Sequence, residues 1–317
     1  MTWQPPVDLP AQPWRGGRHV DEAEALRLVR ARLPDLGACR AELLGVGWDN
    51  TAHLVDGTWL VRFPRRQQGA DLTDRELSVL PRLAGLLPLA VPAPVLVGEA
   101  GDGFPWRFTV ARAVPGVEWW QDPPGPGSAA PAAERLAAAL AVLHSPATAD
   151  RMADALERLP VDPNRRTEPF ERLRRAEAAH ARLTAAGLLG PGLATADLLD
   201  LAERANRPAR APDVLVHGDL HVRHVLVADG APTGLVDWGD VCRAEVSVDL
   251  QVAFALVEGR PRRVFLERYG PVPDGVLDRA RLLAVTLHLV LAGSALDVGD
   301  VPLLAAATEA AHRAVRP

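Results

Sequence analysis

Apolar residues recur along the first third of the chain with two alternating spacings. Residues 21–33, "DEAEALRLVRARL", place apolar side chains at positions 25, 26, 29 and 33, the spacing of one helical face. The runs "ELLGVGWDN", "AHLVDG" and "TWLVRF" are rich in strand-favouring residues, and the Asp56–Gly57 pair between the last two predicts a hairpin. Helical spacing returns over 74–84, and "APVLVGEA" and "WRFTVA" predict two further strands. We therefore expect an N-terminal lobe built on a sheet.

The pattern changes where Pro and Gly become dense, in "RAVPGVEWWQDPPGPGSAAP" over 112–131. We place the boundary here, giving lobes of residues 1–111 and 112–317, and a total length of 317 residues favours two lobes over one. Beyond the boundary helical spacing dominates, with Leu136, Leu140 and Leu143 on one face. The apolar run over 282–296, about 15 residues long, is too short to span a bilayer and predicts a buried helix.

The arginines between 165 and 182 alternate with Glu168, Glu171 and Glu177. This alternation favours a solvated helix face over a phosphate-binding patch. All 35 basic residues of the chain are arginines, so no lysine is available for catalysis.

Composition excludes several classes of protein. Hydrophobic residues make up 48% and charged residues 24%, as in folded soluble domains, and a net charge of −5 argues against nucleic-acid binding. Cys39 and Cys242 stand far apart and outside any metal-knuckle spacing, which is typical of reduced thiols. The N-terminal "MTWQPPVDLPAQPW" lacks the apolar core of a secretory signal. We expect a cytoplasmic protein without membrane or nucleic-acid partners, as a monomer or weak dimer.

One stretch, "LVHGDLHVRHVLV" over 215–227, gathers three histidines and Asp219 between two apolar runs. These runs predict a loop between short strands. Zinc needs at least three converging protein ligands, and neither a cysteine partner nor an HExxH helix is present, so zinc is disfavoured. A second Asp-Gly hairpin follows, and its second strand ends at Asp237, eighteen positions after Asp219. Phosphoryl transfer uses two such carboxylates, one at the attacking hydroxyl and one on magnesium.

The motifs "HGDLHVRHVL" and "GLVDWGD" resemble the catalytic and metal-binding loops of the aminoglycoside phosphotransferase family, small-molecule kinases related in fold to protein kinases. "GVGWDNTAHLVDGTWLVRFPRR" is similar to that family's glycine-containing loop, here with Gly47, and its nucleotide-lysine strand. "RELSVLPRLAGLLPLAVPAPVLVG" resembles its pairing helix and next strand, and "VSVDLQVAF" its acidic segment. The resemblance implies an α+β, two-lobed, protein-kinase-like fold, with an N-terminal antiparallel sheet lobe and a mainly helical C-terminal lobe.

The resemblance also implies roles for single residues. Asp219 would be the catalytic base, and Asp237 would hold Mg2+ at the nucleotide phosphates. His217 and Asp249 would be structural, anchoring the catalytic loop. Asp240 either supports the site or is simply solvated.

Two positions depart from the family's pattern. His224 stands where most members have a metal-binding Asn; imidazole suits magnesium less well, although macrolide kinases of the same superfamily carry a similar His. Arg62 stands where a phosphate-binding Lys is usual, and its guanidinium can still pair with Glu76. If neither change is tolerated, the chain is a nucleotide-binding pseudokinase. The nucleotide's base is expected near "TVARAVPG", where the backbone of Arg112 and Val114 would meet adenine or guanine.

We therefore expect a kinase that moves the γ-phosphoryl group of Mg2+-bound ATP or GTP to a hydroxyl of an antibiotic. An aminoglycoside-like acceptor is favoured; a macrolide, or a housekeeping acceptor such as choline, a sugar or an amino alcohol, is the alternative. From Glu245 to Pro317 the sequence contains nine acidic residues and eight arginines. The charge of this segment therefore does not distinguish between these acceptors. Asp297 and Asp300 are candidate substrate ligands, or else only a polar helix end.

Overall fold

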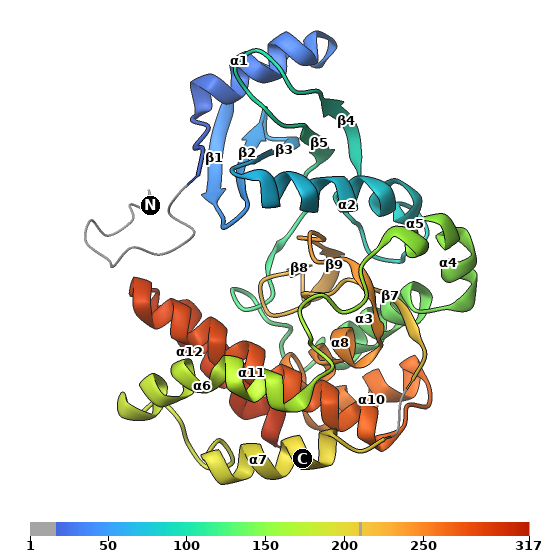
Figure 1. Ribbon diagram of the computed structural model, residues 1–317, viewed down its shortest axis with the longest axis vertical. Coiled ribbons are helices and arrows are strands. Elements are labelled where there is room, and N and C mark those ends of the chain that lie inside the picture. Colours follow the sequence, from blue (N-terminus) through green and yellow to red (C-terminus); the bar gives the residue numbers. More distant parts are fainter. Residues whose placement is uncertain (1–16, 209–210, 317) are drawn as a thin grey trace. The chain divides into compact units, whose positions relative to one another are not determined.

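The computed structural model describes residues 17–208 and 211–316, which divide into two compact units (Figure 1). The N-terminal unit holds residues 17–86 and 90–114. The C-terminal unit holds residues 87–89 and the described residues from 115 onward. The proline-rich stretch over 1–14, where we expect no secretory signal, lies outside the described residues.

The N-terminal unit is a five-stranded antiparallel sheet with two main helices, and its strand order is β1–β2–β3–β5–β4. The Asp56–Gly57 hairpin joins β2 to β3 as predicted, and both residues have positive φ, 50° and 66°, as this tight turn requires. Phe63, Phe104 and Phe108 pack at the centre of the core. The elements in chain order are α1 (Glu22–Arg32), η1 (Pro34–Leu36), β1 (Ala41–Val46), β2 (Asn50–Val55), β3 (Trp59–Pro64), α2 (Gln67–Leu83), β4 (Pro94–Gly98) and β5 (Phe108–Arg112).

Helix α2 begins at Gln67, seven residues before the helical segment expected from 74. Its first turns are mostly polar and carry no apolar periodicity, which is why the pattern missed them. Gly69 in this stretch approaches the loop between β1 and β2 so closely that a Cβ atom would lie 2.3 Å from the carbonyl oxygen of Asp49. The first turns of α2 therefore pack against that loop and do not present an apolar face of their own.

The C-terminal unit is mainly helical and includes short antiparallel strands. This arrangement, with the sheet of the N-terminal unit, confirms the predicted α+β fold class. Its elements are β6 (Val117–Glu118), α3 (Ala129–Leu143), α4 (Pro146–Arg151), α5 (Ala153–Arg158), α6 (Pro169–Ala185), α7 (Thr195–Ala205), β7 (Asp213–Val216), β8 (Val225–Ala228), β9 (Ala231–Leu235), β10 (Cys242–Glu245), α8 (Ser247–Leu250), α9 (Val252–Ala255), α10 (Gly259–Tyr269), α11 (Asp274–Val298) and α12 (Val301–Val315).

Two small sheets in this unit hold the loops that carry the motifs. Strand β7 pairs with β10, and β8 lies between β6 and β9. The second predicted hairpin joins β8 to β9 at Asp229–Gly230, with φ of 52° and 72°. The histidine-rich loop therefore connects β7 to β8, as predicted, and the loop with Asp237 connects β9 to β10.

Helix α11 is the core helix of the C-terminal unit. It has 25 residues, so it is longer than the apolar run over 282–296 and is long and apolar enough to span a bilayer by length and composition. Inside the protein it packs against α6, α7, α8 and α12, and 56% of its most apolar window is buried. The expectation that it is too short to span was wrong, whereas the expectation of a buried helix is confirmed.

Candidate active site

The backbone of the candidate catalytic loop, residues 217–224, is anchored by a buried carboxylate. Asp249 on α8 is fully buried and accepts hydrogen bonds from the backbone N–H of His217 at 2.7 Å and of Gly218 at 3.1 Å. Its Oδ2 also lies 3.1 Å from Nε2 of His144, the residue that follows α3. Burial alone would raise the pKa of Asp249, but these hydrogen bonds and the nearby imidazoles hold that pKa below its usual value.

His217 fixes the next turn of the loop through both ring nitrogens. Its Nε2 lies 3.0 Å from the carbonyl oxygen of Val236, which can only accept, so Nε2 carries the proton. Its Nδ1 then accepts a hydrogen bond from the backbone N–H of Asp219 at 3.3 Å. Complete burial lowers the pKa of His217 to about 4, so the ring is neutral at neutral pH.

Gly218 brings this loop against the loop between β9 and β10. Its φ is +91°, and a Cβ atom at this position would lie 2.1 Å from the carbonyl oxygen of Asp240. Only glycine fits this backbone angle and this approach.

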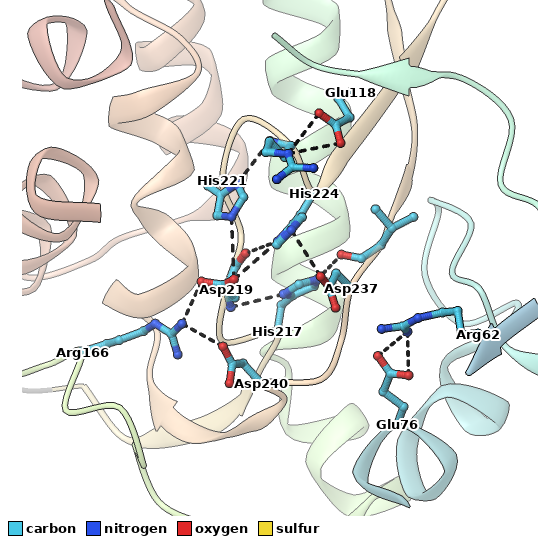
Figure 2. A network of polar contacts seen from close by, with 12 residues as sticks. Arg62, Glu76, Glu118, Arg166, His217, Asp219, His221, His224, Asp237 and Asp240 are labelled. Atoms are coloured by element: carbon cyan, nitrogen blue, oxygen red, sulfur yellow. Dashed lines mark hydrogen bonds and ion pairs between the residues drawn. The ribbon is translucent and has the colours of Figure 1, made fainter. Parts of the chain in front are cut away.

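The two carboxylate oxygens of Asp219 have different surroundings (Figure 2). Oδ1 accepts a hydrogen bond from the Arg166 guanidinium at 2.7 Å, and the same nitrogen of Arg166 donates to Asp240 at 2.9 Å. Asn164 donates to the other oxygen of Asp240 at 3.1 Å. Burial raises the pKa of Asp219, and the charge of Arg166 opposes that rise.

Arg166 corrects the interpretation of the arginine-rich segment. Arg174 and Arg175 do lie exposed or half-exposed on α6 and pair with Glu171, as predicted for a solvated face. Arg166 and Arg172 are buried instead, at 9% and 6% exposure. Burial by itself would lower the pKa of Arg166, but Asp219 and Asp240 outweigh it and raise that pKa. Arg166 is a site residue that the sequence did not reveal.

Asp219 Oδ2 faces two histidines, and one of them, His224, also lies near Asp237. His221 Nε2 and His224 Nδ1 each lie 3.7 Å from it. His224 Nδ1 donates to the backbone carbonyl of Asp219 at 2.7 Å, so in the neutral ring Nε2 keeps its lone pair, and Nε2 lies 3.5 Å from Asp237 Oδ2. Asp237 has a φ of +64°, an unfavourable angle for a residue with a side chain, and such strain often marks functional sites.

The structure also brings together the residues that a zinc site would need. Ligand atoms of Asp219, His221 and His224 lie within 4.8 Å of one another. However, His221 Nδ1 accepts a hydrogen bond from the backbone N–H of Arg223 at 3.2 Å, so its proton is on Nε2. The nitrogens that face Asp219 therefore carry protons rather than lone pairs, which argues against zinc here.

In the N-terminal unit, Arg62 on β3 and Glu76 on α2 form the expected ion pair (Figure 2). One guanidinium nitrogen lies 2.6 and 2.7 Å from the two carboxylate oxygens of Glu76. Gly47 in the loop between β1 and β2 accepts a hydrogen bond from the Arg65 side chain at 2.6 Å.

Arg112 ends β5 with its guanidinium 4.9 Å above the Trp59 ring, and Val114 follows half-buried.

The two aspartates considered as substrate ligands have partners within the protein. Asp297 at the end of α11 forms an ion pair with Arg182 of α6. Asp300 caps α12, and its side chain accepts a hydrogen bond from the backbone N–H of Leu303 at 3.1 Å.

A profile of the phosphotransferase enzyme family matches residues 40–283, which include the Arg62–Glu76 pair and both loops around Asp219. The chain belongs to this family. The resemblance inferred from the motifs is thereby confirmed. A search of curated proteins finds no match.

Solved structures similar to this phosphotransferase-family chain share its fold. The GDP complex of aminoglycoside 2'-phosphotransferase-IIIa is 24% identical, with 93% of this chain and 98% of that chain covered and a TM-score of 0.68. A macrolide 2'-phosphotransferase type I is 24% identical, with 92% and 97% covered and a TM-score of 0.58. A macrolide 2'-phosphotransferase from Brachybacterium faecium is 23% identical, with 92% and 97% covered and a TM-score of 0.56.

Proposed function

We propose that this protein transfers the γ-phosphoryl group of ATP or GTP to a hydroxyl group of a small molecule. The observation that carries the proposal is the surroundings of Asp219. Arg166, which also binds Asp240, fixes one carboxylate oxygen, and the other oxygen faces the side where His224 and Asp237 lie 3.5 Å apart. A fixed carboxylate with one open oxygen beside a pair of metal ligands is the arrangement that phosphoryl transfer uses.

Asp219 would act as the base that orients and deprotonates the acceptor hydroxyl. Its Oδ2 has no side-chain nitrogen within hydrogen-bond distance among the described residues, the two histidines being 3.7 Å away, so it is the oxygen that receives the proton. Arg166 would keep the carboxylate ionised and hold its plane. His217 and Asp249 would keep the loop backbone in place.

His224 and Asp237 would hold the metal ion. The lone pair of His224 Nε2 and a carboxylate oxygen of Asp237 lie 3.5 Å apart, which fits two ligands of one divalent cation. Magnesium bound there would offset the charge of the nucleotide phosphates during transfer. Imidazole is a softer ligand than the usual amide oxygen, so we expect manganese to be accepted at least as well.

In the N-terminal unit, Arg62 would bind the nucleotide phosphates while Glu76 holds its guanidinium. The backbone at Gly47 would cover the phosphates, and the backbone of Arg112 and Val114 would meet the base. Structural neighbours have been solved with GDP and with ADP, so both ATP and GTP belong in the assay.

For the acceptor, we propose an aminoglycoside-like antibiotic first, because an aminoglycoside phosphotransferase with bound kanamycin is among the structures of this fold. Asp297 and Asp300 are the carboxylates that such a polycation would use. A macrolide is the second candidate. It is favoured by His224 and by the pairing of Asp297 with Arg182, which engages one of those two carboxylates.

The test is a screen of purified protein with Mg2+ and ATP or GTP against kanamycin, erythromycin, choline and sugars, followed by nucleotide consumption and product mass. We expect one product heavier by a phosphoryl group. The affinity for kanamycin should fall steeply as the salt concentration rises from low to physiological, whereas the affinity for erythromycin should barely change. Nucleotide binding without turnover, on water or any acceptor, would make the chain a pseudokinase and contradict the proposal.

A further inference from the structure

His221 lies beside the open oxygen of Asp219 and has no part in the function proposed above. Its side chain is only 8% exposed, and Nε2 is 3.7 Å from Asp219 Oδ2 (Figure 2). Its ring lies against that of His224, with 3.8 Å between the ring centroids. The imidazole is therefore held in place with one nitrogen directed at the catalytic carboxylate.

The hydrogen bonds of His221 determine which nitrogen carries the proton. The backbone N–H of Arg223 donates to Nδ1 at 3.2 Å, so Nδ1 presents its lone pair. A neutral imidazole has one N–H group, and in His221 that group is Nε2–H, which faces Asp219.

The gap between these two groups matches one oxygen atom. A distance of 3.7 Å is too long for a direct hydrogen bond between Nε2 and Oδ2. An oxygen placed to one side can lie about 2.8 Å from both. A hydroxyl group both accepts and donates hydrogen bonds, so it satisfies an N–H group and a carboxylate at the same time.

We propose that His221 orients the acceptor hydroxyl by donating a hydrogen bond from Nε2 to its oxygen, while Asp219 Oδ2 accepts its proton. This inference rests on the proposed kinase function. In the transfer, the O–H bond breaks and the proton moves to Oδ2. An oxygen electron pair forms the bond to the γ-phosphorus, and the bond from that phosphorus to the bridging oxygen breaks, releasing the nucleoside diphosphate.

The Nε2–H group of His221 and the Oδ2 atom of Asp219 together also determine which nucleophile the site accepts. An ammonium group has no lone pair, so it cannot accept the hydrogen bond from Nε2, and the N–H dipole points its positive end at it. A neutral hydroxyl satisfies both partners. Of an acceptor that carries hydroxyl and ammonium groups, the protein should phosphorylate oxygen and leave the nitrogens unmodified.

Because the acceptor is unidentified, water serves as the probe in the first test. Hydrolysis of Mg·ATP and Mg·GTP places a water oxygen at the same two groups. His221→Leu should lower hydrolysis about tenfold, the effect of one hydrogen bond, with the nucleotide dissociation constant unchanged. His221→Gln, whose side-chain amide again offers an N–H group, should recover much of the loss. His180→Leu is the matched control, because Nε2 of His180 hydrogen-bonds to the carbonyl of Leu193, outside the catalytic loop.

The second test needs no turnover. Nitrogen-15 spectra of the side-chain imidazoles, with His221 identified by its absence in His221→Leu, should show Nε2 protonated and Nδ1 bare. The opposite tautomer would overturn the inference. So would a folded His221→Leu protein that hydrolyses nucleotide as fast as the parent, and in that case the kinase function would stand. A parent that never turns over nucleotide would instead contradict the proposed function itself.

Discussion

At the scale of single residues, the proposed chemistry depends mostly on the different surroundings of the two carboxylate oxygens of Asp219. One oxygen is held by Arg166, whose guanidinium also binds Asp240, and the other oxygen faces His221 and His224. Partial burial of this carboxylate raises its pKa, and the charge of Arg166 opposes this. In the proposed mechanism, Arg166 is therefore a positioning residue that also keeps Asp219 ionised.

Replacement of Arg166 should change how turnover depends on pH. Without the guanidinium, the pKa of Asp219 rises further, and the ionised fraction at a given pH falls. Arg166→Met should lower turnover at pH 7 by about 10²-fold and move the acid limb of the pH profile to higher pH. Arg166→Lys, which keeps the charge, should retain part of the rate. An unshifted acid limb in Arg166→Met would exclude this role.

A separate prediction concerns Asp237 and His224, the two proposed metal ligands. Asp237→Asn keeps the shape of the side chain but removes its charge, so Mg2+-dependent nucleotide binding should weaken by roughly tenfold or more. His224→Asn should be milder and should shift preference from Mn2+ toward Mg2+. Calorimetric titrations of nucleotide with each metal check both. Curves that overlay the parent would place the cation elsewhere.

At the scale of elements, the site depends on the close approach of two loops, one between β7 and β8 and one between β9 and β10. Asp249 on α8 holds the first loop by its backbone, and Gly218 lets it meet the backbone of Asp240. Ion pairs across Arg166 connect the same two loops through their side chains.

Gly218→Ala should therefore cost more than a substitution at an ordinary left-handed glycine. Gly187 is the matched control, because its φ is +69° but nothing lies within 4 Å of a Cβ atom there. Gly187→Ala should cost about 1 kcal/mol of unfolding free energy, from the backbone angle alone. Gly218→Ala adds a clash with backbone and should cost roughly 3 kcal/mol or more, and it should abolish turnover. Equal losses in denaturant titrations would show that the two loops do not need this contact.

The parts that the sequence predicted were those with local causes. Both Asp-Gly hairpins require positive φ at adjacent residues, and the pattern of β-rich runs on either side is visible within a few positions. Arg166 was missed because it meets Asp219 across 53 residues, and no periodicity near it distinguishes it from the solvated Arg174. The start of α2 was missed for a similar reason, since Gly69 contacts a distant loop instead of extending an apolar face.

At the scale of the whole molecule, buried neutral histidines should make the fold sensitive to acid. Burial lowers the pKa of His217 and of His288 on α11 to about 4 each, against about 6.5 in an unfolded chain. Between these values the unfolded chain binds more protons, so stability falls as pH drops below about 6.5. The loss is fully developed near pH 4, where the folded protein also becomes protonated.

His288→Leu tests this account, because His288 lies outside the proposed catalytic groups. As pH falls from 6 to 4.5, the unfolding free energy of the variant should decrease less steeply than that of the parent. The two slopes should differ by roughly 1.4 kcal/mol per pH unit. Denaturant unfolding at several pH values measures the slope. Parallel slopes for parent and variant would show that His288 does not titrate as described.

The central claim is that Asp219 is the base of a phosphoryl transfer, and the most direct measurement compares Asp219→Ala with the parent. Turnover of Mg·ATP or Mg·GTP and the nucleotide dissociation constant are measured on the same preparations, with Asp213→Ala, an exposed carboxylate at the start of β7, as control. We predict a fall in turnover of roughly 10²- to 10⁴-fold for Asp219→Ala, with nucleotide affinity nearly intact and the control unchanged. A folded Asp219→Ala protein that turns over nucleotide at the parent's rate would contradict the account.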